Sequence, residues 1–480
     1  MKGITAYGVY LPYYRLKRKT IFKAMAWFNP GTAGLAKGEK AVANFDEDSL
    51  TMAVAAGMDC FADIDRSQIT SLALASTTLP YAERGNGSIA AGALNLAKSV
   101  RASDFTGCLK AGTTALISAL NSADSDNTLV CASDCRLSKA GGAQEQMIGD
   151  GAGALVVGNK NIIANLIGHY STSYDFADHR RLNSDKYIRS WEERWMREAG
   201  YIKMIPEVIN AVLLNAGINI ADINKVIFPP LNIREHKGMV KKLGLAKEQV
   251  QDHFLGSVGH TGTALPIIML AAALDQATPG DKILVVSMGS GCDAILFEIT
   301  PEITKLKNRN KLQKNLDYKT ELENYAQYLS FKGMLDKEIG IRGEEVSPTS
   351  VSLQWREQNA ILSLSGARCK ACGTPQYPKE TVCINPDCVA IDQMEDYPFF
   401  DKTGRLFTYT ADHLAFTENP PGLYGIVDFD GGGRFWFDIT DCSLDDLKVG
   451  QPVQMTFRRR YLDEVRGIVG YFWKAMPFKS

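Results

Sequence analysis

The segment DFTGCLKAGTTAL, residues 104–116, combines a cysteine with a following run of small and apolar side chains. Such a run is typical of a helix buried on all faces, with Cys108 at or near its N-terminus. Unpaired backbone amides and the helix dipole at that end favour a thiolate, which can attack a thioester and hold the acyl group covalently. Because a cysteine in an apolar stretch is more often simply core, the segment alone leaves that alternative open.

The chain around this segment, up to about Pro301, alternates short apolar runs with longer stretches rich in Ala, Gly and Leu. The apolar runs are nearly continuous, as in strands that are covered on both faces. This alternation predicts a layered α/β fold built on a mainly parallel sheet. We expect strands at 71–76, 128–132, 154–157, 225–228, 282–286 and 294–297, and helices at 50–62, 88–99, 111–122 and 264–276.

The bulk properties of the chain indicate where it works and what it does not bind. Its 480 residues indicate two or three domains. The formal net charge is −1 and no basic stripe is interleaved with aromatics, so nothing indicates a nucleic-acid partner. No apolar run reaches the roughly 20 residues that span a bilayer, and the start lacks a secretory pattern. We expect a cytoplasmic protein with no membrane partner, whose ten cysteines form no disulfides.

The composition changes after Glu302 and predicts three further segments. Residues 302–353 form a helical linker, with a solvated charge run at 305–311 and a helix around 318–335. Residues 354–395 form a zinc ribbon. Residues 396–480 contain short alternating strands at 406–410, 424–429, 434–437 and 453–457, separated by turns rich in Gly, Asp and Pro, and predict a small β-barrel of the OB type.

Four cysteines in two close pairs predict the metal site of the ribbon. Each pair can form a knuckle, and together the four thiolates close a tetrahedron around Zn²⁺. A closed thiolate shell leaves no open position for a substrate, so the zinc is structural. The alternative is four unliganded thiols that pack as small hydrophobes. The expected ligands are Cys369, Cys372, Cys383 and Cys388.

Residues 104–116 resemble the nucleophile region of the thiolase superfamily, in particular HMG-CoA synthase and β-ketoacyl synthase III. Segments similar to other landmarks of that family follow in its order, at 3–12, 46–53, 149–154, 258–264 and 288–294. The resemblance covers about residues 1–300 and implies a five-layered, duplicated α/β catalytic domain over 1–301. Residues 315–478 resemble the partner module of the same superfamily, a rubredoxin-like zinc ribbon joined to an OB fold.

Departures from the family pattern decide which residues we expect to be catalytic. Pro229 stands where synthases of this kind carry a histidine, and His260 stands where they carry an asparagine. The resemblance therefore implies Cys108 as nucleophile and His260 as a group that deprotonates a donor or hydrogen-bonds the enolate oxygen. Alternatively, a histidine flanked by glycine only binds a backbone carbonyl. The general-acid glutamate of HMG-CoA synthase is a threonine here, with Glu83 nearby as a substitute.

The resemblance implies an acyltransferase that makes or breaks carbon–carbon bonds on a coenzyme A thioester through an acyl-Cys108 intermediate. The reaction is a Claisen-type condensation or, in reverse, thiolysis, with the oxyanion held by backbone amides of Cys108 and of loop 289–291. Two alternatives stay open: a retro-aldolase acting on a β-hydroxyacyl-CoA without an acyl-cysteine, and a non-catalytic acyl-CoA scaffold. Cys292 either transfers a proton or packs. The resemblance also implies a homodimer.

Overall fold

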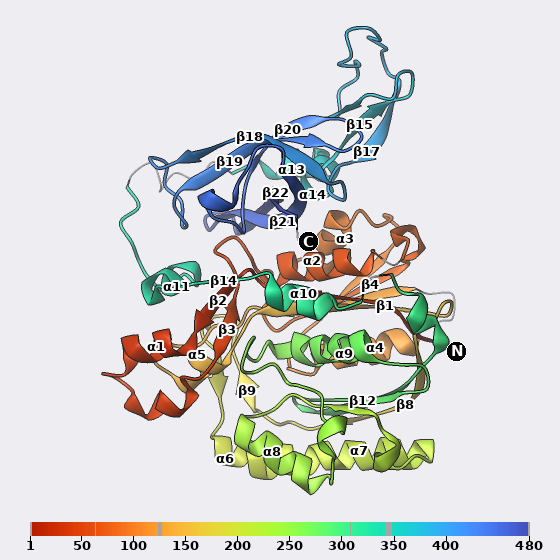
Figure 1. The fold of residues 1–480 in the computed structure, drawn as a ribbon, viewed down its shortest axis with the longest axis vertical. Helices are drawn as coiled ribbons and strands as arrows, with labels where there is room; N and C mark the ends of the chain where they lie inside the picture. Colours follow the sequence, from red (N-terminus) through yellow and green to blue (C-terminus); the bar gives the residue numbers. More distant parts are fainter. Residues whose placement is uncertain (1, 63, 123–126, 308, 341–347, 479–480) are drawn as a thin grey trace. The chain divides into compact units, whose positions relative to one another are not determined.

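The computed structural model describes the chain apart from residues 1, 63, 123–126, 308, 341–347 and 479–480 (Figure 1). The chain forms two compact units. Unit 1 comprises Met1–Asn44, Asp48–Ala91 and Leu96–Tyr328, and unit 2 comprises Phe45–Glu47, Gly92–Asn95 and Leu329–Ser480. In the described part of the chain, every helix is too short or too polar to cross a bilayer.

Unit 1 contains a nine-stranded sheet made of two halves. A short pairing joins the halves, with Gly3 opposite Asn165 and Ile4 opposite Ala164. The first half has the order β1-β7-β6-β4-β5 and the second the order β11-β12-β13-β8. The strands are β1 (Gly3–Tyr10), β4 (Ser71–Ala75), β5 (Arg101–Phe105), β6 (Thr128–Asp134), β7 (Gly151–Gly158), β8 (Ala164–Ser173), β11 (Lys225–Ile227), β12 (Lys282–Met288) and β13 (Gly291–Ile299).

The prediction of a mainly parallel sheet is wrong. Only β4 with β5, β4 with β6, and β11 with β12 pair in parallel, and the other neighbours are antiparallel. The tight turn at Gly289 and Ser290 between β12 and β13 requires antiparallel pairing, because parallel strands need a long crossover. Strands that are buried on both faces look alike in sequence whichever way their neighbours run, so the pattern could not distinguish the two cases.

Helices cover both outer faces of the two sheet halves and also fill the space between them (Figure 1). Helix α2 (Ser49–Cys60) lies on the outside of the first half, and α7 (Ile202–Ala216) with α8 (Ile233–Lys242) lies outside the second. The central layer holds α4 (Ala111–Leu120) and α9 (Leu265–Gln276). Both central helices contribute to one apolar cluster, since each faces a sheet on two sides. The five-layered α/β fold is confirmed.

The region predicted as a helical linker contains helices α10 (Lys311–Asp317) and α13 (Val351–Arg356), which the sequence did not predict, and a strand. Residues 320–321 instead form strand β14, which pairs with β2 (Tyr14–Lys17), and the helix at 318–335 shortens to α11 (Tyr325–Phe331). Lys311, from the charge run predicted to be solvated, is buried and donates to the carbonyls of Tyr7 and Asp59 at 2.7 and 2.8 Å. The prediction that this side chain is solvated, which was made from charge alone, is wrong.

Unit 2 contains two small sheets of the kinds that the sequence predicts. The ribbon sheet has the order β16-β15-β17 and the barrel sheet the order β20-β19-β18-β21-β22. A bridge between Ile439 and Ala475 brings the end of β20 beside β22, which helps to close the barrel. The strands are β15 (Ser365–Cys369), β16 (Pro375–Gln376), β17 (Met394–Pro398), β18 (Gly404–Asp412), β19 (Gly422–Phe429), β20 (Arg434–Asp438), β21 (Pro452–Asp463) and β22 (Ile468–Pro477).

Candidate active site and metal centre

Cys108 lies in the turn between β5 and α4. Gly107 before it has a φ of 97°, a conformation that glycine adopts without strain, and the Ala111 amide donates to the Cys108 carbonyl at 3.1 Å. This turn places Cys108 just ahead of the first helical residue with its side chain half-buried. The sulfur is therefore not sealed in the core, as the simple packing alternative would require.

The surroundings of Cys108 oppose the thiolate that the helix end predicts. Burial raises the pKa of Cys108, and the backbone amide and charge of Lys110 only partly oppose that effect. The carboxylates of Asp293 and Asp178 raise the pKa of Cys108 further. These surroundings favour the thiol, and attack of a thiol on a thioester requires a group that removes the proton.

Asp293 anchors the start of α4 to the β12–β13 loop. Its Oδ1 lies 2.9 Å from Nζ of Lys110, and its Oδ2 accepts from the hydroxyls of Thr113 and Thr114, each at 2.9 Å. A Cβ on Gly289 would stand 2.8 Å from the Leu109 amide nitrogen, so only glycine allows this close approach of the loop. The loop predicted to complete the site thus lies against the nucleophile turn.

The amide of Gly289 is unsuited to the predicted oxyanion role, because it already donates to the carbonyl of Gly291 at 2.9 Å. The next residue, Ser290, has a φ of 51°, which turns the chain sharply between β12 and β13. If this loop supplies an oxyanion donor, the donor is therefore the amide of a residue after Gly289.

His260 is held by hydrogen bonds that fix where its proton lies. Its amide donates to Met147 O at 2.7 Å, while Arg136 Nη2 and the Gly262 amide approach its Nδ1 at 3.0 and 3.2 Å. Guanidinium and amide N–H groups only donate, so Nδ1 accepts and the ring proton is on Nε2. Burial, followed by the charge of Arg136, lowers the pKa of His260 well below its usual range. His260 is thus a neutral hydrogen-bond donor.

Asp134 is a site residue that sequence reasoning missed. It ends β6, and its Oδ1 accepts from the hydroxyls of Ser76 and Thr77 at 3.0 Å, while Oδ2 accepts from the Thr263 amide at 2.8 Å. A buried carboxylate therefore reaches the threonine that replaces the family's general acid. No local pattern marked it, because its partners lie on distant segments. Glu83, the substitute considered from sequence, is exposed.

Cys292 is enclosed in the apolar cluster between the second sheet half and α7. Burial raises its pKa above the ordinary range, and the charge of Asp293 acts in the same direction. A fully buried, protonated thiol surrounded by hydrocarbon fits the packing interpretation of this residue.

Asp178 and His179 form a second group that the sequence did not single out. Asp178 is 3% exposed, and its Oδ2 lies 3.2 Å from Nδ1 of His179. Burial lowers the pKa of Arg136 and the charge of Asp178 partly opposes this, while the same charge adds to the effect of burial in raising the pKa of Cys108. Burial and the charge of Arg136 lower the pKa of His260, and the charge of His179 adds to them. These effects place the pair within electrostatic reach of the thiol and of the Arg136–His260 contact.

A cavity of about 490 Å³ lies beside this group. It is lined in part by Lys139 and Gly142, which follow Arg136 in the chain, and by Arg189 of β10 (Arg189–Ser190), which pairs with β9 (His179–Arg180). Phe28 lies close to Gly141, which precedes the lining residue Gly142, and the neighbouring Trp27 is exposed. The complete lining is Ser138, Lys139, Gly142, Ala143, Gln144, Ile188, Arg189 and Ser190.

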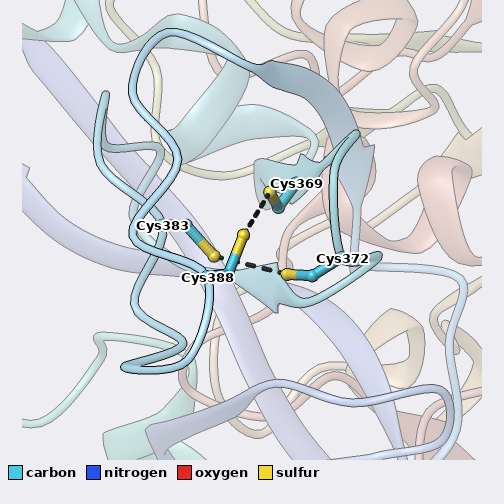
Figure 2. A group of neighbouring side chains, drawn as sticks. All are labelled: Cys369, Cys372, Cys383 and Cys388. Atoms are coloured by element: carbon cyan, nitrogen blue, oxygen red, sulfur yellow. Dashed lines mark hydrogen bonds between the residues drawn. The ribbon is translucent and has the colours of Figure 1, made fainter.

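The structure brings the four predicted metal ligands together in unit 2 (Figure 2). Their sulfur atoms all lie within 4.8 Å of one another. The Cys369–Cys388 and Cys372–Cys383 sulfur distances are 3.9 and 3.5 Å. A tetrahedron with Zn–S bonds of about 2.3 Å has edges of about 3.8 Å, close to these two distances, so the four thiols suit a tetrahedral zinc site.

Comparisons with known proteins agree with this architecture. A family model for the 3-oxoacyl-[acyl-carrier-protein] synthase III C-terminal domain matches residues 213–299. Models for the ChsH2 rubredoxin-like zinc ribbon domain and the ChsH2 C-terminal OB-fold domain match residues 362–395 and 399–458. The ribbon match and the clustered thiolates together identify a structural zinc site.

Two hydroxymethylglutaryl-CoA synthases align with this chain over most of their own length. The hydroxymethylglutaryl-CoA synthase of Thermococcus gammatolerans is 31% identical over 334 residues, which cover 68% of this chain and 93% of that protein. That of Methanothermobacter thermautotrophicus is 31% identical and covers 70% and 99%. An HMG-CoA synthase structure complexed with CoA superposes with a TM-score of 0.62 at 19% identity, covering 73% of this chain and 94% of that chain.

The fold and these matches define an acyltransferase, or condensing enzyme, of the thiolase superfamily joined to a zinc ribbon and an OB-fold domain. More specifically, the chain belongs to the hydroxymethylglutaryl-CoA synthase family.

Proposed function

We propose that the enzyme condenses two acyl-CoA thioesters through an acyl group carried on Cys108. The sulfur attacks the carbonyl of the first thioester, forming a new C–S bond while coenzyme A leaves as its thiol. The enolate carbon of the second thioester then attacks the acyl carbon and expels the Cys108 thiolate. Coenzyme A complexes among the structural relatives support this substrate class.

The fixed tautomer of His260 is the observation that carries the proposal. Its Nε2–H can donate to an oxygen on which negative charge develops, and its low pKa prevents it from becoming an imidazolium. A neutral donor of fixed orientation stabilises an enolate or oxyanion without reorganising during the reaction. Of the two roles that the sequence left open for His260, the geometry supports the donor.

The cavity lined by Lys139 and Arg189 offers a place for the nucleotide part of coenzyme A. Lys139 and Arg189 supply positive charge for its phosphates, although Arg189 also pairs with Asp185 at 3.2 Å. Trp27 is 81% exposed, and an exposed indole offers a flat surface for the adenine ring. We therefore propose that the pantetheine arm runs from this cavity toward Cys108.

Retro-aldol cleavage of a β-hydroxyacyl-CoA is the second candidate function. The raised pKa of Cys108 favours it, because this reaction needs an oxyanion site and a base but no thiolate. It would use His260 in the same donor role. The two candidates therefore differ in whether Cys108 is required.

The test measures coenzyme A release and product formation by the purified full chain with pairs of acyl-CoA thioesters. Replacing Cys108 with Ala should abolish condensation, whereas Cys131→Ala, which removes a buried thiol from β6, should not. Cleavage of β-hydroxyacyl-CoA that survives Cys108→Ala would favour the retro-aldolase. A wild-type chain that binds acyl-CoA and turns over neither substrate class would indicate the scaffold.

We also propose that the enzyme works as a homodimer, as the family resemblance implies. Sedimentation velocity on the full chain checks this proposal. A species of twice the 52.6 kDa chain mass is expected, and a monomer at micromolar concentration would contradict it.

A further inference from the structure

The direction of the His260 ring is tied to the peptide of Gly262. The proposed function, on which this inference rests, uses the Nε2–H of His260 as a donor, and a donor helps only when it points at the developing charge. The other ring nitrogen is fixed, because Nδ1 accepts from Arg136 Nη2 at 3.0 Å and from the Gly262 amide at 3.2 Å. Whatever holds the turn at 260–263 therefore also aims this donor.

The end of strand β6 holds that turn through two side chains. Oδ2 of Asp134 accepts from the Thr263 amide at 2.8 Å. Arg136 Nη2 also donates to His260 O at 3.3 Å. Gly262 has a φ of 62°, and a Cβ on this residue would collide with Oδ2 of Asp134. The carboxylate therefore lies directly against the glycine whose amide binds the imidazole.

The same end of β6 also holds the turn at 76–78, where HMG-CoA synthases carry their general-acid glutamate. Oδ1 of Asp134 accepts from the Thr77 amide at 2.7 Å and from the Thr77 hydroxyl at 3.0 Å. The Cys135 amide donates to Thr78 Oγ1 at 2.9 Å. The end of β6 thus binds two turns of the site at once.

Strand pairing places the 76–78 turn beside the nucleophile turn. β4 lies between β5 and β6 and pairs with both in parallel, so the carboxyl ends of the three strands meet at one edge of the sheet. The Ser76 amide donates to Phe105 O at 3.0 Å, and the chain continues from Phe105 into the turn that carries Cys108. Asp134 therefore connects the surroundings of Cys108 to the turn that carries His260.

Only a carboxylate satisfies both sides of this contact. The Thr77 amide faces Oδ1 of Asp134 and the Thr263 amide faces Oδ2, and a backbone amide nitrogen can only donate. An asparagine at position 134 would direct its own N–H group at one of these amides, whichever way its side chain is turned. Asp134 is fully buried, so solvent does not replace the lost contact.

We propose that Asp134 is a positioning residue, which aims the Nε2–H of His260 at the substrate oxygen where negative charge develops. Its side chain is enclosed, so it does not meet the substrate and acts through the two turns that it joins. Arg136 determines which nitrogen of His260 carries the proton, while Asp134 determines where that nitrogen points. The substrate thereby meets a donor whose direction is already fixed.

Asp134→Asn tests the proposal with two measurements on the full chain. Steady-state kinetics with a pair of acyl-CoA thioesters should show kcat lower by about 100-fold and KM within about threefold of the wild type, because an aimed donor acts on the transition state. Nitrogen NMR of the chain labelled on its histidines reports the His260 ring directly, since the chain has six histidines. The wild-type ring should be neutral with its proton on Nε2, and Asp134→Asn should shift or broaden its signals.

Asp275→Asn is the matched control. Asp275 is also a carboxylate with several donors in unit 1, but it accepts from Tyr7 Oη at 2.7 Å and from the Asn310 and Leu312 amides at 2.9 and 3.2 Å. This variant should lose stability and keep both kcat and the His260 signals. Losses as large as those of Asp134→Asn would show general destabilisation and overturn the proposal.

A second pair of variants decides the question if Asp134→Asn does not fold. Thr77→Val removes one hydroxyl donor to the carboxylate and should lower kcat about tenfold and shift the His260 signals, whereas Thr77→Ser keeps the hydroxyl and should resemble the wild type. Unchanged His260 signals or an unchanged kcat in the folded variant overturns the proposal. A wild-type chain that turns over no acyl-CoA pair contradicts the proposed function instead, and the His260 signals, which need no substrate, still decide the role of Asp134.

Discussion

Nη2 of Arg136 lies 3.0 Å from Nδ1 of His260, and this contact decides what the histidine can do. A guanidinium has only donors and stays charged in proteins, so the nitrogen that faces it must accept. His260 is thereby kept neutral with its proton on Nε2. The residue that replaces the family's asparagine is therefore, like an asparagine amide, a hydrogen-bond donor.

Substitutions at position 260 distinguish a donor from a base. His260→Asn retains an N–H donor, so condensation should stay within about tenfold of the wild-type rate, whereas His260→Ala should lose about 100-fold or more. Steady-state kinetics with a pair of acyl-CoA thioesters measures both values. If His260→Asn is as inactive as His260→Ala, the imidazole acts as a base and the tautomer assignment is wrong.

The pH dependence of Cys108 reactivity follows from its raised pKa. Burial and two carboxylates favour the thiol, so alkylation by iodoacetamide should rise through a midpoint above the ordinary thiol value of about 8.5. Asp178→Asn should move the midpoint to lower pH, because it removes a negative charge. Peptide mapping over a range of about pH 6–11 measures the midpoint. A midpoint below about 8 would show that the helix N-terminus lowers the pKa of Cys108 more than burial and the carboxylates raise it.

Removing one partner of the buried Lys110–Asp293 ion pair should lower the free energy of unfolding. Asp293→Ala leaves the Lys110 ammonium buried without its carboxylate, and we expect a loss of about 3–5 kcal/mol of unfolding free energy. Urea unfolding of the full chain measures it. The double variant Asp293→Ala/Lys110→Met, which removes the orphaned charge, should recover much of the loss. A single variant as stable as the wild type would contradict the role of Asp293 as an anchor.

Zinc content should depend on the four ribbon thiolates alone. The wild-type chain should contain about one zinc ion, and Cys369→Ser should contain almost none, because three thiolates and a hydroxyl bind far more weakly. Cys442→Ser is the matched control, since Cys442 is a buried cysteine of the same unit outside the cluster. Elemental analysis after dialysis measures the ratio. Full zinc occupancy in Cys369→Ser would contradict the assigned ligand set.

Local patterns in the sequence were enough for the parts of the site that lie close together in the chain. The spacing of the ribbon cysteines predicts a cluster that the structure forms, and the small and apolar residues after Cys108 predict the helix that begins just beyond it. These features depend on neighbouring residues, whose geometry the sequence determines directly.

The remaining features depend on segments that meet only in the folded chain. Asp134, Arg136 and Asp178 end strands or lie in loops with no distinctive neighbours, and their partners are distant in sequence. The sign of the Cys108 pKa shift also could not be predicted, because desolvation depends on the whole surrounding layer. A helix end alone indicated a thiolate, and the enclosed site reversed that expectation.

Trapping the acyl group tests the central claim most directly. The full chain is mixed with acetyl-CoA, quenched in acid within seconds, digested and mapped by mass spectrometry. We predict an acetyl thioester on the peptide that carries Cys108. The same peptide of Cys108→Ser should carry no thioester. Adding a second acyl-CoA should remove the acetyl group from the wild-type peptide. Condensation that proceeds while Cys108 stays unmodified throughout would contradict it.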